Sequence, residues 1–243
     1  MNVGCCINYC DIGTFNAVDD FDFIEVRFLE LAQIGNLRNL PKIFAVNNLY
    51  PRDKNIFEEE LENTYEYFDN VFKTLATYQV KLVTFGSGKA RIFNDFNNLT
   101  SNFSKWCNIL KYLEAKSIET GISVGIEPLN NDETNFIKKV EDAVFYINLL
   151  GLKNVGITLD SYHFFSENDS VQAVKDNISK IKHFHIASDT RSFPTSLPKQ
   201  AGKLLETIIS CGYKGNVSVE IDWREKPIND SKFINIVRKL YEK

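Results

Sequence analysis

The chain has 243 residues, of which 44% are hydrophobic and 25% charged, with a formal net charge of −4. This composition is typical of a globular protein with a well-buried core, and the charge excludes the clustered basic surface that nucleic acid requires. No apolar run is long enough to span a membrane, and the N-terminus lacks the basic segment and apolar core of a signal peptide. We therefore expect a cytoplasmic protein that binds neither nucleic acid nor membranes.

The five cysteines are odd in number and show no CxxC spacing of the metal or redox type. Their positions are Cys5, Cys6, Cys10, Cys107 and Cys211. We expect reduced and mostly buried thiols, in keeping with a cytoplasmic location.

Apolar runs alternate with helical stripes along most of the chain. Eight runs predict strands, at residues 3–9, 23–28, 43–47, 80–85, 122–126 and 155–159, through Phe184 and Ile186, and at residues 217–221. Apolar residues spaced by three or four predict helices around residues 57–75, 103–113, 140–150, 170–179, 204–209 and 233–240. Gly151 is expected to cap the third of these helices.

This alternation predicts a parallel sheet with helical crossovers, and no linker or low-complexity tract interrupts it. Eight such units in this length favour a closed (β/α)8 TIM barrel over an open sheet. We expect one domain over residues 1–243. The connections after the first two strands are short, so their helices are expected to be reduced.

Polar residues end four of the later strands. Glu127 precedes Pro128, which cannot extend a strand ladder, and the next three strands end at Asp160, His185 and Glu220. Parallel barrel strands bring such side chains to one mouth, where barrels of this type place their chemistry. One imidazole and three carboxylates suit a single Mn²⁺, Mg²⁺ or Co²⁺ ion rather than a thiolate zinc site.

Four segments around these positions carry a family resemblance. They are Gly-Ile-Glu127-Pro-Leu-Asn, Leu-Asp160-Ser-Tyr-His163, His183-Phe-His185-Ile-Ala-Ser-Asp-Thr-Arg191 and Gly212-Tyr-Lys-Gly215-Asn-Val-Ser-Val-Glu220. They resemble the xylose isomerase-like TIM barrel superfamily, above all its branch of ketose 3-epimerases and hydroxypyruvate isomerases. The likeness covers residues 121–222 well and the first half only loosely, through Asn47 with Pro51 and the glycine-containing run 86–91.

The resemblance implies one divalent metal held by the positions that match Glu127, Asp160, His185 and Glu220. It selects His185 over His183 as the ligand, whereas strand periodicity does not choose, because both histidines face the same way. His183 is then expected to support the site or to pack behind it.

The resemblance also implies that Glu133, His163 and Arg191 contact the substrate. Each has an alternative interpretation that the sequence leaves open. His163 also fits a hydrogen-bonded histidine in the barrel mouth, Arg191 a surface arginine, and Glu133 an acidic helix start.

Such a site predicts an isomerase of carbohydrate metabolism that acts on a small sugar or sugar phosphate. One carboxylate, Glu127 or Glu220, removes the proton beside a carbonyl, giving an enediolate, and the two residues act as an acid/base pair. Return of the proton to the same carbon gives an epimer, and return to the neighbouring carbon interconverts aldose and ketose. A homo-oligomer is possible.

Other functions remain open. A dehydratase of a cyclic polyol, like the inosose dehydratases, begins with the same proton abstraction, and a non-catalytic barrel binds sugar without turnover. The run from Gly86 to Arg91 fits either a phosphate cradle or a plain turn. Endonuclease IV shares the barrel, but its trinuclear, histidine-rich site does not suit a chain with three histidines.

Two departures from the family concern the substrate lid. Arg191 is followed by Ser-Phe-Pro194-Thr195, where family members often have Pro-Gly, so the covering loop is expected to differ. The chain is also shorter than typical ketose epimerases, and a reduced lid is expected.

Overall fold

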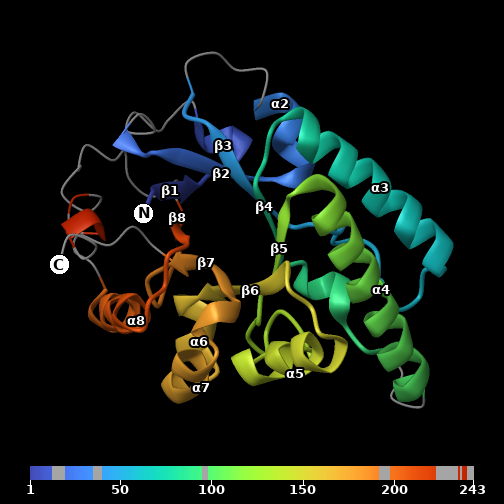
Figure 1. Cartoon of the computed structure of the whole chain (residues 1–243). Coiled ribbons are helices and arrows are strands. Elements are labelled where there is room, and N and C mark those ends of the chain that lie inside the picture. The colour runs from blue at the N-terminus through green and yellow to red at the C-terminus, as the bar shows by residue number, and fades with distance from the viewer. Residues whose placement is uncertain are drawn as a thin grey trace.

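The structure is a computed structural model that describes residues 1–12, 20–34, 40–94, 98–191, 198–222, 235 and 237–239. Eight parallel strands form a closed barrel in sequence order, which confirms the predicted fold (Figure 1). The strands are β1 (Val3–Cys6), β2 (Phe23–Arg27), β3 (Ile43–Asn47), β4 (Leu82–Phe85), β5 (Ser123–Ile126), β6 (Val155–Asp160), β7 (Ile181–Ile186) and β8 (Asn216–Glu220).

Helices lie around the outside of the strands (Figure 1). They are α1 (Tyr9–Ile12), α2 (Leu31–Ile34), α3 (Leu61–Thr77), α4 (Leu99–Thr120), α5 (Val140–Leu150), α6 (Ser161–Ser166), α7 (Val171–Asp176) and α8 (Lys199–Ser210). The first two helices have four residues each, as the short connections predict. Residues 235 and 237–239 are helical, and the rest of the helix predicted at 233–240 lies outside the described residues.

Two element boundaries and one additional helix illustrate where the structure differs from the prediction. The first strand ends at Cys6 rather than at residue 9, because Tyr9 begins α1 and is 45% exposed. Helix α3 begins at Leu61 rather than at residue 57, because Phe57 packs against the hydrophobic core from the turn before the helix. Helix α6 was not predicted, and it begins where the carboxylate of Asp160 accepts two backbone N–H groups.

Most of the hydrophobic core lies between the strands and the helices. Phe85 of β4 contacts Phe68 of α3 and Trp106 of α4, with ring centroids 6.4 Å and 5.4 Å apart. Gly121 and Gly151 end α4 and α5 with positive φ angles of 69° and 64°, which glycine adopts without strain. Each of these turns leads directly to a strand of the barrel, and the predicted cap at Gly151 is confirmed.

The inside of the barrel holds several fully buried polar side chains. The hydroxyls of Thr84 and Thr158 form a hydrogen bond of 2.9 Å, and Glu25, His183 and Ser218 form a second polar group. Barrel interiors of this type are usually filled by branched aliphatic residues. The polar filling therefore requires internal hydrogen-bond partners for each group.

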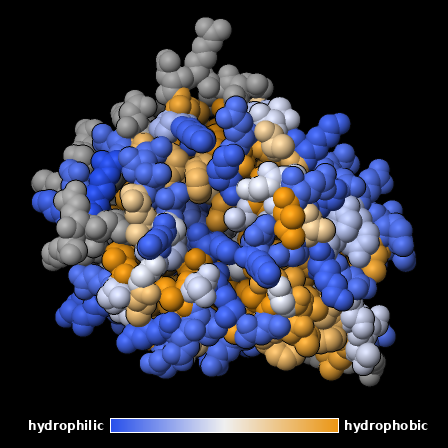
Figure 2. Space-filling model, in the orientation of Figure 1, coloured by the Kyte–Doolittle hydropathy of each residue, from blue (hydrophilic) through white to orange (hydrophobic). Residues whose placement is uncertain are grey.

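The outer surface is largely hydrophilic on the face that Figure 2 shows, with hydrophobic side chains exposed mainly toward α4 and α5. Phe103 of α4 and the α5 residues Phe145 and Leu149 are exposed there. Within the described ranges, no helix is long and apolar enough to cross a lipid bilayer. The expected homo-oligomer stays a prediction.

The start of β6 is held by one carboxylate. Glu114 of α4 accepts the backbone N–H groups of Lys153, Asn154 and Val155 at 2.8 to 3.1 Å. These bonds hold the end of the barrel at which the parallel strands begin, opposite the mouth at which they end.

We predict that Glu114→Ala lowers the free energy of unfolding by about 1–3 kcal/mol, because three backbone donors lose a charged acceptor. Urea denaturation measures the change. Glu119→Ala is the control: Glu119 is also on α4, its side chain is 66% exposed, and its loss is expected to change stability by less than about 0.5 kcal/mol. Equal stabilities of the two variants would contradict the prediction.

Candidate metal centre and active site

Four strands deliver the predicted metal ligands to one mouth of the barrel. Glu127 follows β5, Asp160 ends β6, His185 lies near the end of β7, and Glu220 ends β8. Each offers one ligand atom, and these atoms lie within 4.8 Å of one another. Closure of a parallel barrel thus brings together residues that are up to 93 positions apart, from Glu127 to Glu220.

The imidazole of His185 is at the centre of this group. Its Nδ1 atom lies 2.9 Å from Glu220 Oε2, 3.1 Å from Glu127 Oε1 and 3.9 Å from Asp160 Oδ2. Burial by itself would lower the pKa of His185, but the surrounding carboxylates raise it well above its usual range. The carboxylates therefore stabilise a positive charge at the position of His185.

The pKa values of Asp160 and Glu220 are shifted in opposite directions. Burial raises the pKa of Asp160 well above its usual range, and Glu220 and Glu127 add to this effect while Arg191 opposes it. Burial also acts to raise the pKa of Glu220, but Arg191 and His185 outweigh it and hold that pKa well below the usual range.

The donor set fits a hard divalent cation. Asp160 uses Oδ1 to accept the N–H groups of Tyr162 and His163, which caps α6. Its other oxygen, Oδ2, is buried at the cluster, and no hydrogen bond from the described residues reaches it. A buried carboxylate oxygen without a donor is costly unless a cation or proton balances it. Three carboxylates and one imidazole are suitable ligands for such an ion.

The carboxyl group of Glu127 is held tightly from behind. A Cβ atom added to Gly86 would lie 1.9 Å from Glu127 Oε2, so only glycine leaves room for the carboxylate. Arg91, which is fully buried, donates from Nη2 to the backbone carbonyl of Glu127 at 2.9 Å. Its guanidinium also lies 5.4 Å from the ring centroid of Phe85.

This arrangement removes one of the two cations from the phosphate interpretation of the run from Gly86 to Arg91. Arg91 points into the protein and binds a carbonyl, so its guanidinium is not available to a phosphate. Burial lowers the pKa of Arg91 to about 10, which still leaves it charged at neutral pH. The run includes a 3-10 helix at Gly88–Arg91, and its arginine supports the backbone of Glu127.

The three residues expected to contact a substrate lie together beside the cluster. Arg191 Nη2 lies 2.8 Å from His163 Nε2 and 3.8 Å from Asp160 Oδ2. Glu133 Oε1 lies 3.9 Å from His163 Nε2 and 4.0 Å from Arg191 Nη1. The loop after Arg191, residues 192–197, lies outside the described residues.

His163 is held in its neutral form. Its Nδ1 atom accepts the backbone N–H of Asn130 at 3.1 Å, while Nε2 faces the guanidinium of Arg191. Burial, together with the neighbouring Arg191, lowers the pKa of His163 to about 4. A neutral imidazole has one acceptor nitrogen, so only one of these two donors can be hydrogen-bonded to it at a time.

A cavity of about 400 Å³ opens over the cluster, a size that suits a small-molecule site. Sequence reasoning missed several polar side chains that line it, namely Asn8, Asp11, Arg27, Asn48 and Arg52. Asn8 and Asp11 follow β1, Arg27 ends β2, and Asn48 and Arg52 follow β3, and no motif there distinguishes a lining residue from a solvated one.

Glu25 was also missed as a functional residue. It lies inside β2 with no exposed surface, and both imidazoles of β7 contact its carboxylate. Burial would raise the pKa of Glu25, but His185 and His183 outweigh it and lower that pKa below its usual range. The available signal was a carboxylate within an otherwise apolar strand, which requires a buried partner.

Comparison with known proteins identifies the family. Residues 21–236 match the family model described as "Xylose isomerase-like TIM barrel". The chain therefore belongs to this family, which confirms the resemblance noted in its sequence.

Among curated relatives, the 3-dehydro-D-guloside 4-epimerase of Escherichia coli (strain K12) is 37% identical over 112 residues. That alignment covers 46% of this chain and 43% of the relative, so it spans less than half of the relative's length.

Two solved structures show the likeness of the fold. D-psicose 3-epimerase with D-tagatose, from Clostridium cellulolyticum H10, has a TM-score of 0.76 at 17% identity and covers 100% of this chain and 92% of its own. The IOLI protein with a bound zinc atom has a TM-score of 0.72 at 18% identity and covers 99% of this chain and 96% of its own.

We predict that Gly86→Ala weakens divalent metal binding by about tenfold or more, because the new methyl group displaces the carboxylate of Glu127, and loss of a ligand position is felt at that level. Titration of the purified protein with Mn²⁺, followed by calorimetry, measures the affinity.

Gly151→Ala is the control for this variant. It places a Cβ in open space at a left-handed position far from the ligands, so it lowers stability but leaves metal affinity unchanged. The prediction is wrong if both glycine variants bind Mn²⁺ like the unaltered protein.

Proposed function

We propose that this protein is a divalent-metal-dependent sugar epimerase or isomerase. The observation that carries the proposal is the group of three carboxylates around His185 Nδ1, at the base of a polar cavity of about 400 Å³. The curated relative reported above is by name a 3-dehydro-D-guloside 4-epimerase, and one of the similar structures was solved with D-tagatose.

One ion is proposed to bind between Glu127, Asp160, His185 and Glu220, and Mn²⁺, Mg²⁺ or Co²⁺ suits their oxygen-rich set. When bound, it supplies charge that holds and polarises the substrate carbonyl and so acidifies the neighbouring C–H bond. The similar IOLI structure holds a zinc atom, which supports the proposal that this chain binds a metal.

Glu127 and Glu220 are the proposed acid/base pair. They approach His185 Nδ1 from β5 and β8, which are separated by two strands of the barrel. A substrate between them has one carboxylate on each side. One removes the proton beside the carbonyl, which gives an enediolate, and the other returns a proton to the opposite face or to the neighbouring carbon.

His163 and Arg191 are proposed to orient the substrate, and Glu133 to accept a hydroxyl. Because His163 Nδ1 accepts the N–H of Asn130, the ring proton is on Nε2, which faces the guanidinium of Arg191. A substrate oxygen placed between them would accept hydrogen bonds from both side chains. The guanidinium of Arg191 also lies 4.7 Å from the ring centroid of Tyr162, which fixes its plane.

The substrate class is a small keto sugar or its phosphate, in keeping with the cavity volume and its polar lining. We further infer a cytoplasmic location, because the chain's five cysteines are all thiols rather than disulfides.

Proton exchange tests the activity. The protein is incubated with Mn²⁺ and a panel of free and phosphorylated keto sugars in D₂O, the metal is removed with a chelator, and the sugars are followed by NMR. Deuterium beside the carbonyl is the expected result. Glu127→Gln and Glu220→Gln are expected to slow the exchange by about 10²–10⁴-fold, the usual contribution of a general acid or base.

Glu119→Gln, on the exposed face of α4, removes a carboxylate far from the cavity and is the matched control. Sugar that binds without exchange, with or without metal, would favour a sugar-binding barrel. Loss of water from a cyclic polyol would instead identify a dehydratase. Either result would overturn the epimerase proposal.

A further inference from the structure

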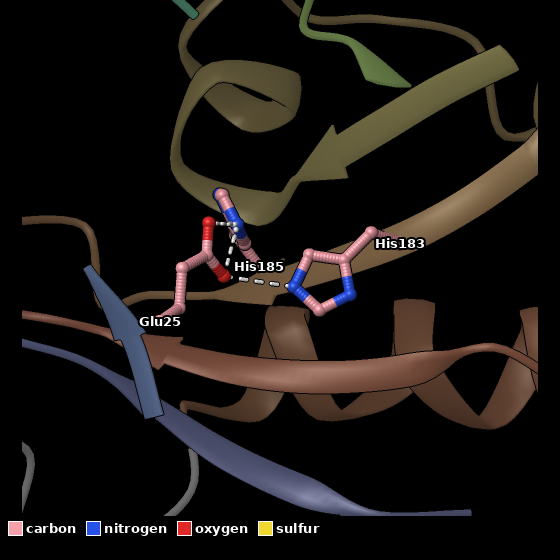
Figure 3. A group of neighbouring side chains, drawn as sticks. All are labelled: Glu25, His183 and His185. Atoms are coloured by element: carbon pink, nitrogen blue, oxygen red, sulfur yellow. Dashed lines mark hydrogen bonds and ion pairs between the residues drawn. The ribbon is translucent and has the colours of Figure 1, made fainter. Parts of the chain in front are cut away.

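Glu25 reaches across the inside of the barrel to the two histidines of β7. Its strand, β2, is separated from β7 by β1 and β8, so the contact does not follow from strand pairing. Figure 3 shows the carboxylate beside the two imidazoles, with a ring nitrogen of each directed at it. Glu25 Oε2 lies 2.9 Å from His183 Nε2, and both carboxylate oxygens lie 3.1 Å from His185 Nε2.

These contacts fix which ring nitrogen of His185 carries a proton. An ionised carboxylate only accepts hydrogen bonds, so His185 Nε2 must donate to Glu25. In the neutral ring, the lone pair is then on Nδ1, the atom that faces Glu127 and Glu220. Glu25 thus presents the correct nitrogen to the proposed metal.

His183 holds the carboxylate in place from the other side. Its Nε2 atom also lies 2.9 Å from Ser218 Oγ, and the described residues offer no partner to its Nδ1 atom. This pattern matches an imidazole that is protonated on Nε2 and donates to Glu25. The two imidazoles are 5.0 Å apart and nearly perpendicular, at 89°, so they approach the carboxylate from different directions.

We propose that Glu25 is a positioning residue that fixes the tautomer and ring orientation of His185 for metal binding, with His183 anchoring its carboxylate. The inference rests on the metal site proposed above. Carboxylates that accept the second N–H of a metal-bound histidine commonly support metal sites. Their loss typically lowers metal affinity by about 10- to 100-fold.

A competing interpretation is a second metal ion. Glu25, His183 and His185 each offer an atom within 4.8 Å of the others. An ion at this position would take the Nε2 lone pair of His185, while the first ion takes its Nδ1 lone pair. The ring would then have no proton, and the protein would bind two ions instead of one.

Calorimetric titration of the full chain with Zn²⁺ separates these possibilities. We expect one Zn²⁺ ion per chain and, in Glu25→Gln, an affinity lower by about 10- to 100-fold, because the amide offers one acceptor and turns a donor toward an imidazole. Glu25→Asp shortens the side chain but keeps the charge, and is expected to retain more affinity than Glu25→Gln.

Thr84→Val is the matched control. Thr84 is as fully buried inside the barrel as Glu25, and its hydroxyl pairs with Thr158 rather than with the cluster. The variant is expected to lose stability, measured by urea denaturation, without a change in Zn²⁺ affinity. A loss of affinity that only followed stability would appear in both variants.

Nitrogen-15 NMR of the histidines gives a readout independent of activity and of metal. The chain has only three histidines, and His163→Asn assigns one of them. In the metal-free protein, the Nε2–H signals of His183 and His185 are expected to be far downfield and slow to exchange, and to move upfield in Glu25→Gln. In the Zn²⁺-loaded protein, His185 is expected to keep its proton on Nε2.

The outcomes are distinct for the two proposals. If the unaltered protein binds no Zn²⁺, the proposed metal site fails, and the Nε2–H signals still decide whether Glu25 fixes the ring. Unchanged Nε2–H signals and Zn²⁺ affinity in Glu25→Gln would overturn the role of Glu25. Binding of two Zn²⁺ ions that falls to one in Glu25→Gln would replace it with a second metal site.

Discussion

The imidazole of His185 lies between two buried sets of negative charge, and the mouth of the barrel depends on this position. Glu25 faces its Nε2 atom from the barrel interior, while Glu127, Glu220 and Asp160 face its Nδ1 atom from the mouth. Carboxylates buried so close together repel one another unless positive charge separates them. Without an ion, a protonated His185 ring supplies this charge; the proposed cation would supply it when the neutral ring binds through Nδ1.

The supports around this centre act on backbone and side chain together. Arg91 holds the carbonyl of Glu127 while Gly86 leaves space for its carboxylate, so the strand end and the ligand are fixed by the same turn. Asp160 divides its two oxygens between the start of α6 and the cluster. Glu127 and Asp160, two of the proposed ligands, are therefore held in place by neighbouring backbone and side chains, as a preorganised site requires.

The barrel interior contains two groups of buried polar side chains. Thr84 and Thr158 form a hydrogen bond with each other, and Glu25, His183 and Ser218 form a second polar group that extends to His185. A polar network of this kind is stable only when its members find partners inside the protein. The same residues that would be a defect in a purely structural barrel thus connect its interior to the chemistry at its mouth.

The sequence by itself determined the fold and the four strand-end residues, because each depends on local patterns. Alternating apolar runs and helical stripes predict the barrel, and Pro128 marks the strand end that places Glu127 at the mouth. The tertiary structure alone decided the direction of Arg91, the cavity lining and the role of Glu25. Glu25 and His183 are 158 positions apart in the sequence, and β1 and β8 lie between their strands. Barrel closure creates this contact, so local periodicity cannot predict it.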